Sequence, residues 1–337
     1  MAFPQLQTTN LDTLISTTLQ AYLPQMEINA ITSVPLVRYL LDENARRVQG
    51  GTRINIQLLY GYNSTTTWYN QSDYIDVSPQ EAVTAAQYKW ANLVGAVTVF
   101  GEEEAANSNE AMLQDFVQAK ITQLELSIAR QLNQAAYGDG TGFFGGAPDG
   151  LANLVFSTAT PADPASGAVG GISAVTFPFW RNNANLSPGT YAANGSMGTA
   201  NSDFQLRMFH LCTDGSLRPT FIISDNTVYE SYQFNAGVHY RATEAKDMDL
   251  GFEHINYKGV PWVWDRDCPA GCQYFINSKF LYSVVDPNRF FRPTDWMPTI
   301  TQDGKVLRLH LRMNNVCSNR MLQGVIGQPG VTANSWS

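Results

Sequence analysis

Apolar and polar residues alternate over residues 52–60, a pattern typical of a half-buried strand. The alternation returns over residues 82–100. The stretch between these limbs, residues 62–76, is polar and aromatic, and it has no apolar period that would fold it onto a core. The pattern predicts a long β-hairpin, Gly50 to Phe100, that projects from the body of the protein. Since a projecting arm needs a surface to lie on, this stretch indicates an assembling subunit rather than a solitary enzyme.

A helical period follows the hairpin directly. Asn107 and Glu110 have the spacing of a capping box, and Gly138 marks the end of the period. Apolar residues recur every three or four positions along one stripe: Leu113, Phe116, Val117, Ile121, Leu124, Ile128 and Leu132. A helix over 107–137 would be roughly 45 Å long. We expect it to lie across a sheet as a backbone element.

Strict alternation appears again late in the chain. Leu307, Leu309, Leu311 and Met313 share one face of a predicted strand, and Arg308, His310 and Arg312 share the other, basic face. Shorter patterns predict strands at 219–224, 259–264 and 273–277 and helices at 202–210 and 228–234. Residues 1–49 predict only two short helices, 11–19 and 37–48, too fragmented to build a core.

Composition narrows the function. Hydrophobic residues make up 44% of the 337 residues and charged residues only 15%, so much of the surface is expected to be covered by partners. The net charge of -8 disfavours a protein that reads nucleic-acid sequence, because such proteins carry a basic face. We find no signal peptide, and the longest apolar run, near 93–100, is too short to cross a bilayer. Four cysteines fit a reducing cytoplasm.

Motifs for catalysis are weak. The glycine-rich stretch 138–146 lacks the lysine of a phosphate-binding loop and follows a helix instead of preceding one, so we interpret it as the exit from that helix. Cys268 and Cys272 have the wrong spacing for a zinc site and are interpreted as free thiols, although a disulfide formed after cell lysis is conceivable. We predict no catalytic, cofactor-binding or metal-binding residue, and no enzyme activity.

Candidate interface residues fall in three groups. Trp68, Tyr69 and Tyr74 at the hairpin tip are suited to anchor a neighbouring subunit, or alternatively to stack on a sugar as in a lectin. Glu102, Glu103 and Glu104 are suited to a solvated patch near a helix start, to a cation site, or to pairing between subunits with the third group, Arg308, His310 and Arg312. A glycosidase pair of carboxylates stays open, since their spacing in space is invisible in the sequence.

Four phrases carry a family resemblance: Gly-Gly-Thr-Arg-Ile-Asn-Ile at 50–56, Ala-Ala-Gln-Tyr-Lys-Trp at 85–90, Phe-Trp-Arg-Asn at 179–182 and Pro-Ala-Gly-Cys-Gln-Tyr-Phe-Ile-Asn at 269–277. Together with the order of elements, they resemble the major capsid protein of tailed bacteriophages with the Hong Kong 97-type fold. The resemblance implies an α+β chain with an N-terminal arm (1–49), an extended β-hairpin loop (50–95), a peripheral domain (96–150 and 299–330) with a spine helix (107–137), and an axial domain (151–298).

The resemblance also implies a function. Copies of the chain would form pentamers and hexamers in an icosahedral shell around double-stranded DNA, assembled in the host cytoplasm and located in the virion, without a membrane. The arm begins at Met1 without a coiled-coil prefix, so the resemblance implies either a separate scaffolding protein or assembly that needs none, with a portal and possible decoration proteins as further partners. Lys89 matches one partner of the covalent cross-link that some members form, but the other partners have no match, so none is predicted. The alternatives are an encapsulin-like nanocompartment shell and a β-rich carbohydrate-binding or receptor-binding protein.

Overall fold

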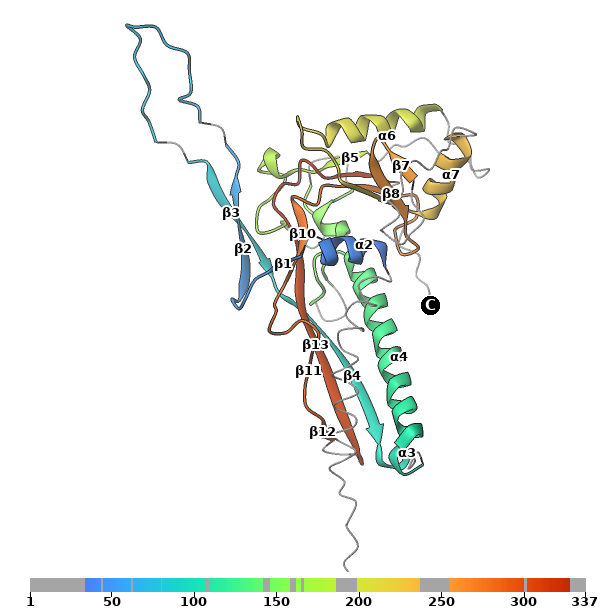
Figure 1. The fold of residues 1–337 in the computed structure, drawn as a ribbon. Helices are drawn as coiled ribbons and strands as arrows, with labels where there is room; N and C mark the ends of the chain where they lie inside the picture. The colour runs from blue at the N-terminus through green and yellow to red at the C-terminus, as the bar shows by residue number, and fades with distance from the viewer. Residues whose placement is uncertain are drawn as a thin grey trace, which may run out of the picture.

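One long helix, two six-stranded sheets and a projecting hairpin are the largest features of the described part of the chain (Figure 1). The computed structural model describes residues 34–43, 45–61, 63–79, 81–106, 110–141, 146–157, 162–164, 167–185, 199–236, 255–299 and 302–327. The predicted helix 11–19 lies outside these residues. The predicted α+β class is confirmed.

The elements have the following bounds. The long sheet contains β1 (Arg46–Arg47), β4 (Ala91–Phe100), β10 (Leu281–Val285), β11 (Arg292–Pro293), β12 (Met297–Pro298) and β13 (Gly304–Cys317). The second sheet contains β5 (Asn183–Asn185), β6 (Phe221–Ser224), β7 (Ile255–Tyr257), β8 (Val260–Trp264), β9 (Gln273–Ile276) and β14 (Gly324–Ile326). The hairpin is β2 (Arg53–Leu59) and β3 (Val83–Lys89). The helices are α2 (Pro35–Arg38), the π-helical turn η1 (Tyr39–Glu43), α3 (Gly101–Ala106), α4 (Glu110–Tyr137), α5 (Leu151–Leu154), the 3-10 turn η2 (Pro178–Trp180), α6 (Thr199–Leu211) and α7 (Asn226–Ala236).

Strand β13 organises the long sheet. It pairs antiparallel with β4 over ten positions, from Gly304 opposite Phe100 to Met313 opposite Ala91. It also pairs antiparallel with β10, β11 and β12. The predicted alternation is confirmed, because Leu307, Leu309, Leu311 and Met313 are all buried. The range predicted as axial domain, 151–298, therefore contains strands of both sheets.

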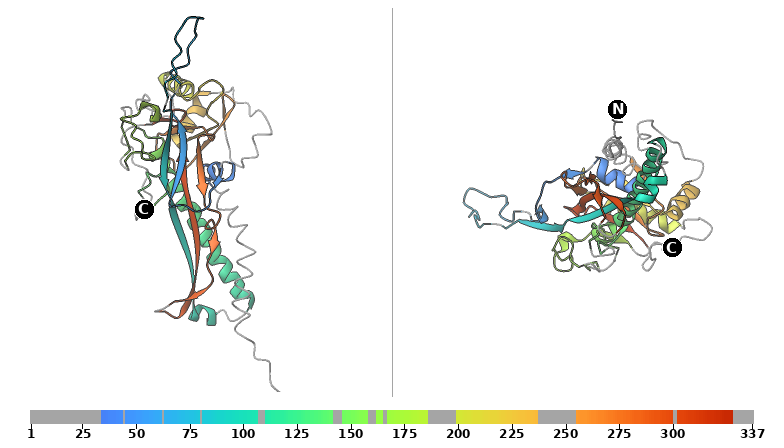
Figure 2. Two further views of the ribbon diagram at one scale, coloured as in Figure 1. Left: turned by 90° about the vertical axis from the view of Figure 1, so that its left-hand side faces the viewer. Right: turned by 90° about the horizontal axis from the view of Figure 1, so that it is seen from below.

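Helix α4 lies along the inner face of this sheet (Figure 2). Ile121, Ile128 and Leu132 of the predicted apolar stripe are buried, and Leu124 packs against the same core. The approach is close because β4 has a glycine at the crossing: a Cβ on Gly95 would lie 2.5 Å from Leu124 Cδ1. The helix ends at Tyr137, as predicted. Asn107 and the side chains of Leu113, Phe116 and Val117 lie outside the described part.

The hairpin is shorter than the sequence predicted. Strand β2 pairs only with β3, from Arg53 opposite Lys89 to Leu59 opposite Val83. After Trp90 the chain leaves the hairpin and enters the long sheet as β4. The prediction that residues 91–100 continue the returning limb is wrong, because β13 offers β4 a ten-residue partner that buries Val97 and Val99.

The second sheet lies between two apolar layers. Ile222, Trp262 and Phe275 face α6 and α7 in one cluster. The alternate residues Ile223, Val263 and Tyr274 face the main core. Two-sided burial explains the near-continuous apolar runs of these strands. The predicted strands and helices of this region are confirmed.

The segment before the hairpin differs from its prediction. Helical structure begins at Pro35, a residue favoured at the first helical position, and continues only to Glu43. Arg46 and Arg47, predicted as helical, pair in parallel with β10. Leu36 and Leu40 are buried in the main core, so this end of the predicted arm packs on its own chain.

Candidate assembly surfaces

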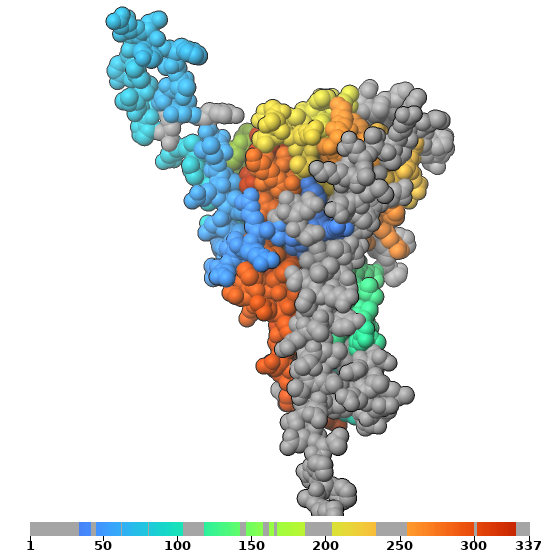
Figure 3. Space-filling model, viewed as in Figure 1, coloured from blue at the N-terminus to red at the C-terminus, as the bar shows by residue number. Residues whose placement is uncertain are grey.

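The hairpin tip, residues 63–79, is the most exposed part of the described chain. It stands clear of the body in Figure 3. Trp68 is fully exposed and Tyr74 is 91% exposed, and Tyr69 and Val77 are also exposed. Its hydrogen bonds are local; for example, the Asn70 N–H donates to Asp73 Oδ2 at 2.7 Å and the Ser78 N–H donates to Asp76 Oδ1 at 2.9 Å. The tip therefore exposes several large apolar side chains next to one another.

The base of the hairpin, in contrast, is anchored to the body. The Tyr88 hydroxyl donates to Cys317 O at 2.8 Å from a buried position, and the Gln87 N–H donates to Gly170 O at 2.8 Å. At the junction with the tip, Tyr60 stacks on Phe179 with ring centroids 5.0 Å apart. The hairpin is therefore presented from a fixed root.

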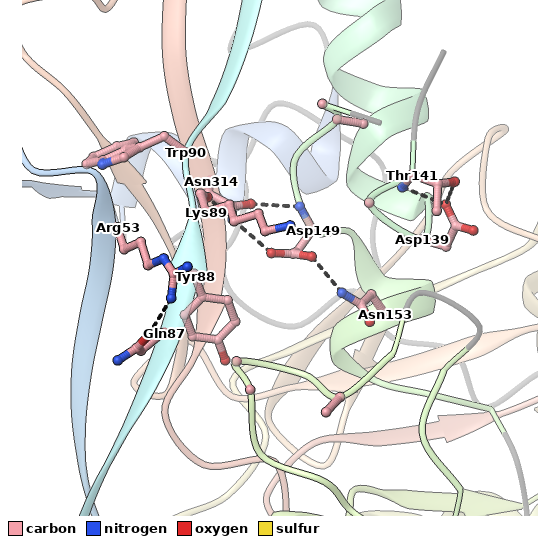
Figure 4. Close-up of a pocket in the computed structure, with 16 residues that line it drawn as sticks. Arg53, Gln87, Tyr88, Lys89, Trp90, Asp139, Thr141, Asp149, Asn153 and Asn314 are labelled. Atoms are coloured by element: carbon pink, nitrogen blue, oxygen red, sulfur yellow. Dashed lines mark hydrogen bonds between the residues drawn. The ribbon is translucent and has the colours of Figure 1, made fainter. Parts of the chain in front are cut away.

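A cavity of about 490 Å³ lies beside this root (Figure 4). Arg53 donates to Gln87 Oε1 at 2.9 Å on one wall. On another wall the Asp149 carboxylate accepts hydrogen bonds from Asn153 Nδ2 at 2.6 Å and Asn314 Nδ2 at 2.8 Å. Burial raises the pKa of Asp149, although both amide donors and the nearby Lys89 oppose that shift.

Hydrogen bonds in the wall of the cavity connect three segments of the chain. Asn314 Nδ2 also donates to Lys89 O at 2.6 Å, and Asn315 Nδ2 donates to Asp149 O at 2.9 Å. These bonds tie β13, β3 and the loop after α4 together. The described lining holds no histidine or cysteine beside its carboxylates, and the described residues contain no group of three His, Cys, Asp or Glu arranged for a metal ion.

The outer face of the long sheet carries the basic residues predicted on β13. Cross-strand pairing places Val94, His310 and Arg292 in one row and Ala96 and Arg308 in the next. Arg292 and Arg308 are exposed, and Val94 is 56% exposed. Within the described part of the chain, no hydrogen bond or ion pair engages the side chains of Arg292, Arg308 or His310.

Arg312, the third predicted basic residue, is engaged within its own chain. Its guanidinium donates to Asp286 Oδ2 at 3.0 Å and to Gly51 O at 2.9 Å, and it lies 4.6 Å from the centre of the Trp90 ring. These contacts connect the start of the hairpin to β13. Arg312 therefore holds the root of the hairpin.

The acidic candidates lie in α3, directly after β4. Glu102 is exposed. Glu103 forms an ion pair with Lys120 of α4 at 3.5 Å and accepts the Phe100 N–H at 3.2 Å. The side chain of Glu104 lies outside the described part. Pairing of this segment with the basic strand face of a neighbour stays a prediction.

Two buried polar centres were not anticipated from the sequence. Arg320 is fully buried and donates to Leu154 O, Trp180 O and Asn182 Oδ1 at 2.8 to 3.0 Å. Where α4 meets the second sheet, the Tyr137 hydroxyl donates to Asp265 Oδ2 at 2.9 Å. Burial raises the pKa of Asp265, as it does the pKa of the nearby Cys268 thiol. Cys268 and Cys272 are both buried, and neither forms a disulfide within the described part of the chain.

None of the helices in the described ranges combines the length and the hydropathy needed for a bilayer span. No protein-family model matches the chain, and no curated protein matches its sequence.

Solved structures do match. A chain of the cyanophage A-1(L) capsid asymmetric unit matches with a TM-score of 0.63 at 16% identity, over 89% of this chain and 92% of that chain. The capsid of the native GTA particle matches with a TM-score of 0.54 at 12% identity, over 87% of this chain and 90% of that chain. The capsid of the empty GTA particle matches with a TM-score of 0.52 at 12% identity, over 86% and 96%. The chain therefore has the fold of these capsid chains, and the capsid-type fold predicted from the sequence is confirmed.

Proposed function

We propose that this protein is a major capsid protein that assembles into the icosahedral head shell of a tailed bacteriophage around double-stranded DNA. The observation that carries the proposal is a capsid-type fold, matched over nearly the whole chain, that presents an unsupported aromatic hairpin from an anchored root. A hairpin of that kind gains stability only on another molecule.

In the proposed shell, the domain built around the second sheet gathers five or six copies about local axes. The hairpin lies across the adjacent subunit, and the N-terminal arm, residues 1–49, contacts further neighbours. Each contact is modest, but a subunit held by several partners leaves only when all of them release together. We further propose a separate scaffolding protein and a portal as partners, and assembly in the host cytoplasm.

Electron microscopy of the purified protein, with and without its co-expressed neighbouring genes, tests the proposal. We expect closed icosahedral particles, and particles from the native source should contain double-stranded DNA. Native particles filled with a cargo enzyme would instead identify an encapsulin-like compartment. A small soluble oligomer that binds glycans would contradict both.

A further inference from the structure

Strand β4 forms one edge of the long sheet, and its sequence does not protect that edge. Within the described part of the chain, β4 pairs only with β13, so its other side is open along its length (Figure 2). Its ten residues include no charged side chain and no proline. A long, uncharged, open edge is a template on which another strand can add.

The other edge strands of the two six-stranded sheets are protected. On the far side of β13, the short strands Arg46–Arg47, Arg292–Pro293 and Met297–Pro298 each have two residues and contain an arginine or a proline. In the second sheet, the edge strands β5 and β7 have only three residues each. Short strands, charges and prolines all hinder strand addition. The edge of β4 lacks these devices and therefore suits a partner strand.

The backbone directions in β4 follow from its neighbour β13. Arg308 lies opposite Ala96 and uses its backbone on the other side of β13. Its C=O accepts the Thr294 N–H at 2.8 Å, and its N–H donates to Thr294 Oγ1 at 3.1 Å. Arg308 and Ala96 therefore form a non-hydrogen-bonded pair, and the N–H and C=O of Ala96 point away from β13.

The same direction repeats at every second residue of β4. The Arg312 carbonyl, opposite Asn92, also turns away from β4 and accepts the Asp286 N–H at 3.1 Å. At the far end, the Phe100 N–H points away from β13 and donates to Glu103 Oε2 at 3.2 Å. Between these ends, within the described ranges, the open edge presents the unpaired N–H and C=O groups of Asn92, Val94, Ala96 and Thr98.

We propose that β4 of one copy pairs antiparallel with β4 of a second copy about a two-fold axis, which joins two long sheets into one. The inference rests on the proposed function, because a closed symmetric shell supplies such isologous contacts. Centring the pair on Gly95 places Val94 opposite Ala96 of the second copy, and Asn92 opposite its Thr98. All four free residues then exchange hydrogen bonds, about eight in total.

Charges beyond the two ends of β4 favour a second copy as the partner. The register brings Gly101 of one copy level with Lys89 of the other. The exposed Glu102 therefore comes beside the exposed Lys89 at both ends of the pair. A parallel arrangement would instead place the two Glu102 side chains together. Weak surface pairs of this kind set orientation more than affinity.

Matched charges at two exposed positions test the pairing. In Val94→Lys/Ala96→Lys, each lysine faces a lysine of the second copy, and the yield of closed particles should fall at least about tenfold. In Val94→Lys/Ala96→Glu, each lysine faces a glutamate, and the yield should return to within about threefold of wild type. Both positions are exposed. Circular dichroism and thermal unfolding of the unassembled variants establish that they fold.

Cysteine cross-linking tests the register without added charges. The Cα atoms of a hydrogen-bonded antiparallel pair lie about 5.5 Å apart, within the range that a disulfide spans. After particles are oxidised by dissolved oxygen with a copper catalyst, Val94→Cys/Ala96→Cys should run as a dimer on a non-reducing gel. Asn92→Cys/Val94→Cys is the matched control on the same exposed face and should stay monomeric, because it places no two cysteines opposite each other.

Each outcome decides between the inference and its rivals. Normal particles from the two-lysine variant, an equally defective lysine–glutamate variant, or the absence of the cross-linked dimer would overturn the β4 pairing and leave the proposed function intact. If the lysine variants fail to fold, the cysteine pair decides alone. Failure of the wild-type chain to form any shell would instead overturn the proposed function.

A strand from residues 1–33 is the rival occupant of the edge. The Val94→Cys/Ala96→Cys substitutions are therefore also made in a chain that lacks these residues. Dimers from both the full and the shortened chain would support the β4 pairing. Dimers from the shortened chain alone would assign the edge to the arm and contradict the inference.

Discussion

At the scale of single residues, Gly150 packs directly against the backbone at the end of α4. A Cβ at this position would lie 2.4 Å from Gly138 O and 2.5 Å from Ala135 O. These are backbone atoms, so no side chain can swing away to relieve the clash. Gly146 in the same loop is exposed and has open space around it.

We therefore expect Gly150→Ala to lower the free energy of unfolding by about 1–3 kcal/mol, the usual cost of overpacking. The measurement is urea unfolding of the unassembled subunit. Gly146→Ala is the matched control and should stay within about 0.5 kcal/mol of wild type. Equal stability of the two variants would show that the helix end tolerates displacement.

Asp265 carries a pH dependence. Burial raises its folded-state pKa above the ordinary value of 3.8, so the folded protein holds this proton more tightly than the unfolded chain. The resulting stability is fully present below pH 3.8 and is lost as pH rises through the folded pKa. The loss is about 1.4 kcal/mol for each unit by which the pKa is raised.

Asp265→Asn removes this titration. The free energy of unfolding of the variant, relative to wild type, should therefore increase from pH 4 toward neutrality, as measured by urea unfolding at a series of pH values. Asp214→Asn, at an exposed position, should run parallel to wild type. A constant difference between Asp265→Asn and wild type at every pH would refute the assignment.

At the scale of elements, the hairpin separates into a root that the body holds and a tip that it does not. The root is fixed by Tyr88, Arg312 and the Asp149–Asn314 network. The tip makes local hydrogen bonds and exposes Trp68 and Tyr74. Removal of the tip should therefore spare folding and remove an intermolecular contact.

Replacing residues 61–81 by a two-residue Asn-Gly turn should leave a folded subunit, because the turn would then follow Tyr60 and precede Ala82, which are already paired by the Tyr60 N–H to Ala82 O hydrogen bond. Particle formation should be lost. Thermal unfolding reports the first outcome, and sedimentation with negative-stain electron microscopy reports the second. Normal particles from this variant would show that the tip is not an assembly contact.

Periodicity predicted the elements well where one face is buried. The β13 alternation and the α4 stripe are examples, since burial on one side imposes the period directly. Periodicity failed where the position of a strand depends on which other strand it pairs with. Residues 91–100 look like a hairpin limb, yet they pair with β13, more than 200 positions later in the chain.

The sequence predicted which kinds of residue the candidate surfaces carry, but not which residues the fold brings together there. The alternation at 307–313 revealed a basic face, but Arg292 joins that face only through the β11 register. Similarly, Arg312 reads as exposed in the sequence, whereas Asp286 and Gly51 engage it in the fold. Distant partners of this kind leave no local signal.

At the scale of the whole molecule, the net charge of -8 bears on the proposed DNA content. Phosphate repulsion would let packed DNA move and leave without sticking to the shell. We expect emptied particles to bind added duplex DNA only weakly, even at low ionic strength, where attraction would be greatest. Tight binding in a low-salt filter or fluorescence assay would contradict the proposal that the acidic shell repels its DNA.

The ten-position pairing of β4 with β13 has a mechanical consequence. A pull directed along the strands loads the rungs of this ladder together in shear, so they cannot open one after another like a zipper. The same strand continues past β4 to pair with β10 as far as Cys317. In the proposed shell, outward pressure from packed DNA would therefore be carried along β13, a single continuous strand of the subunit.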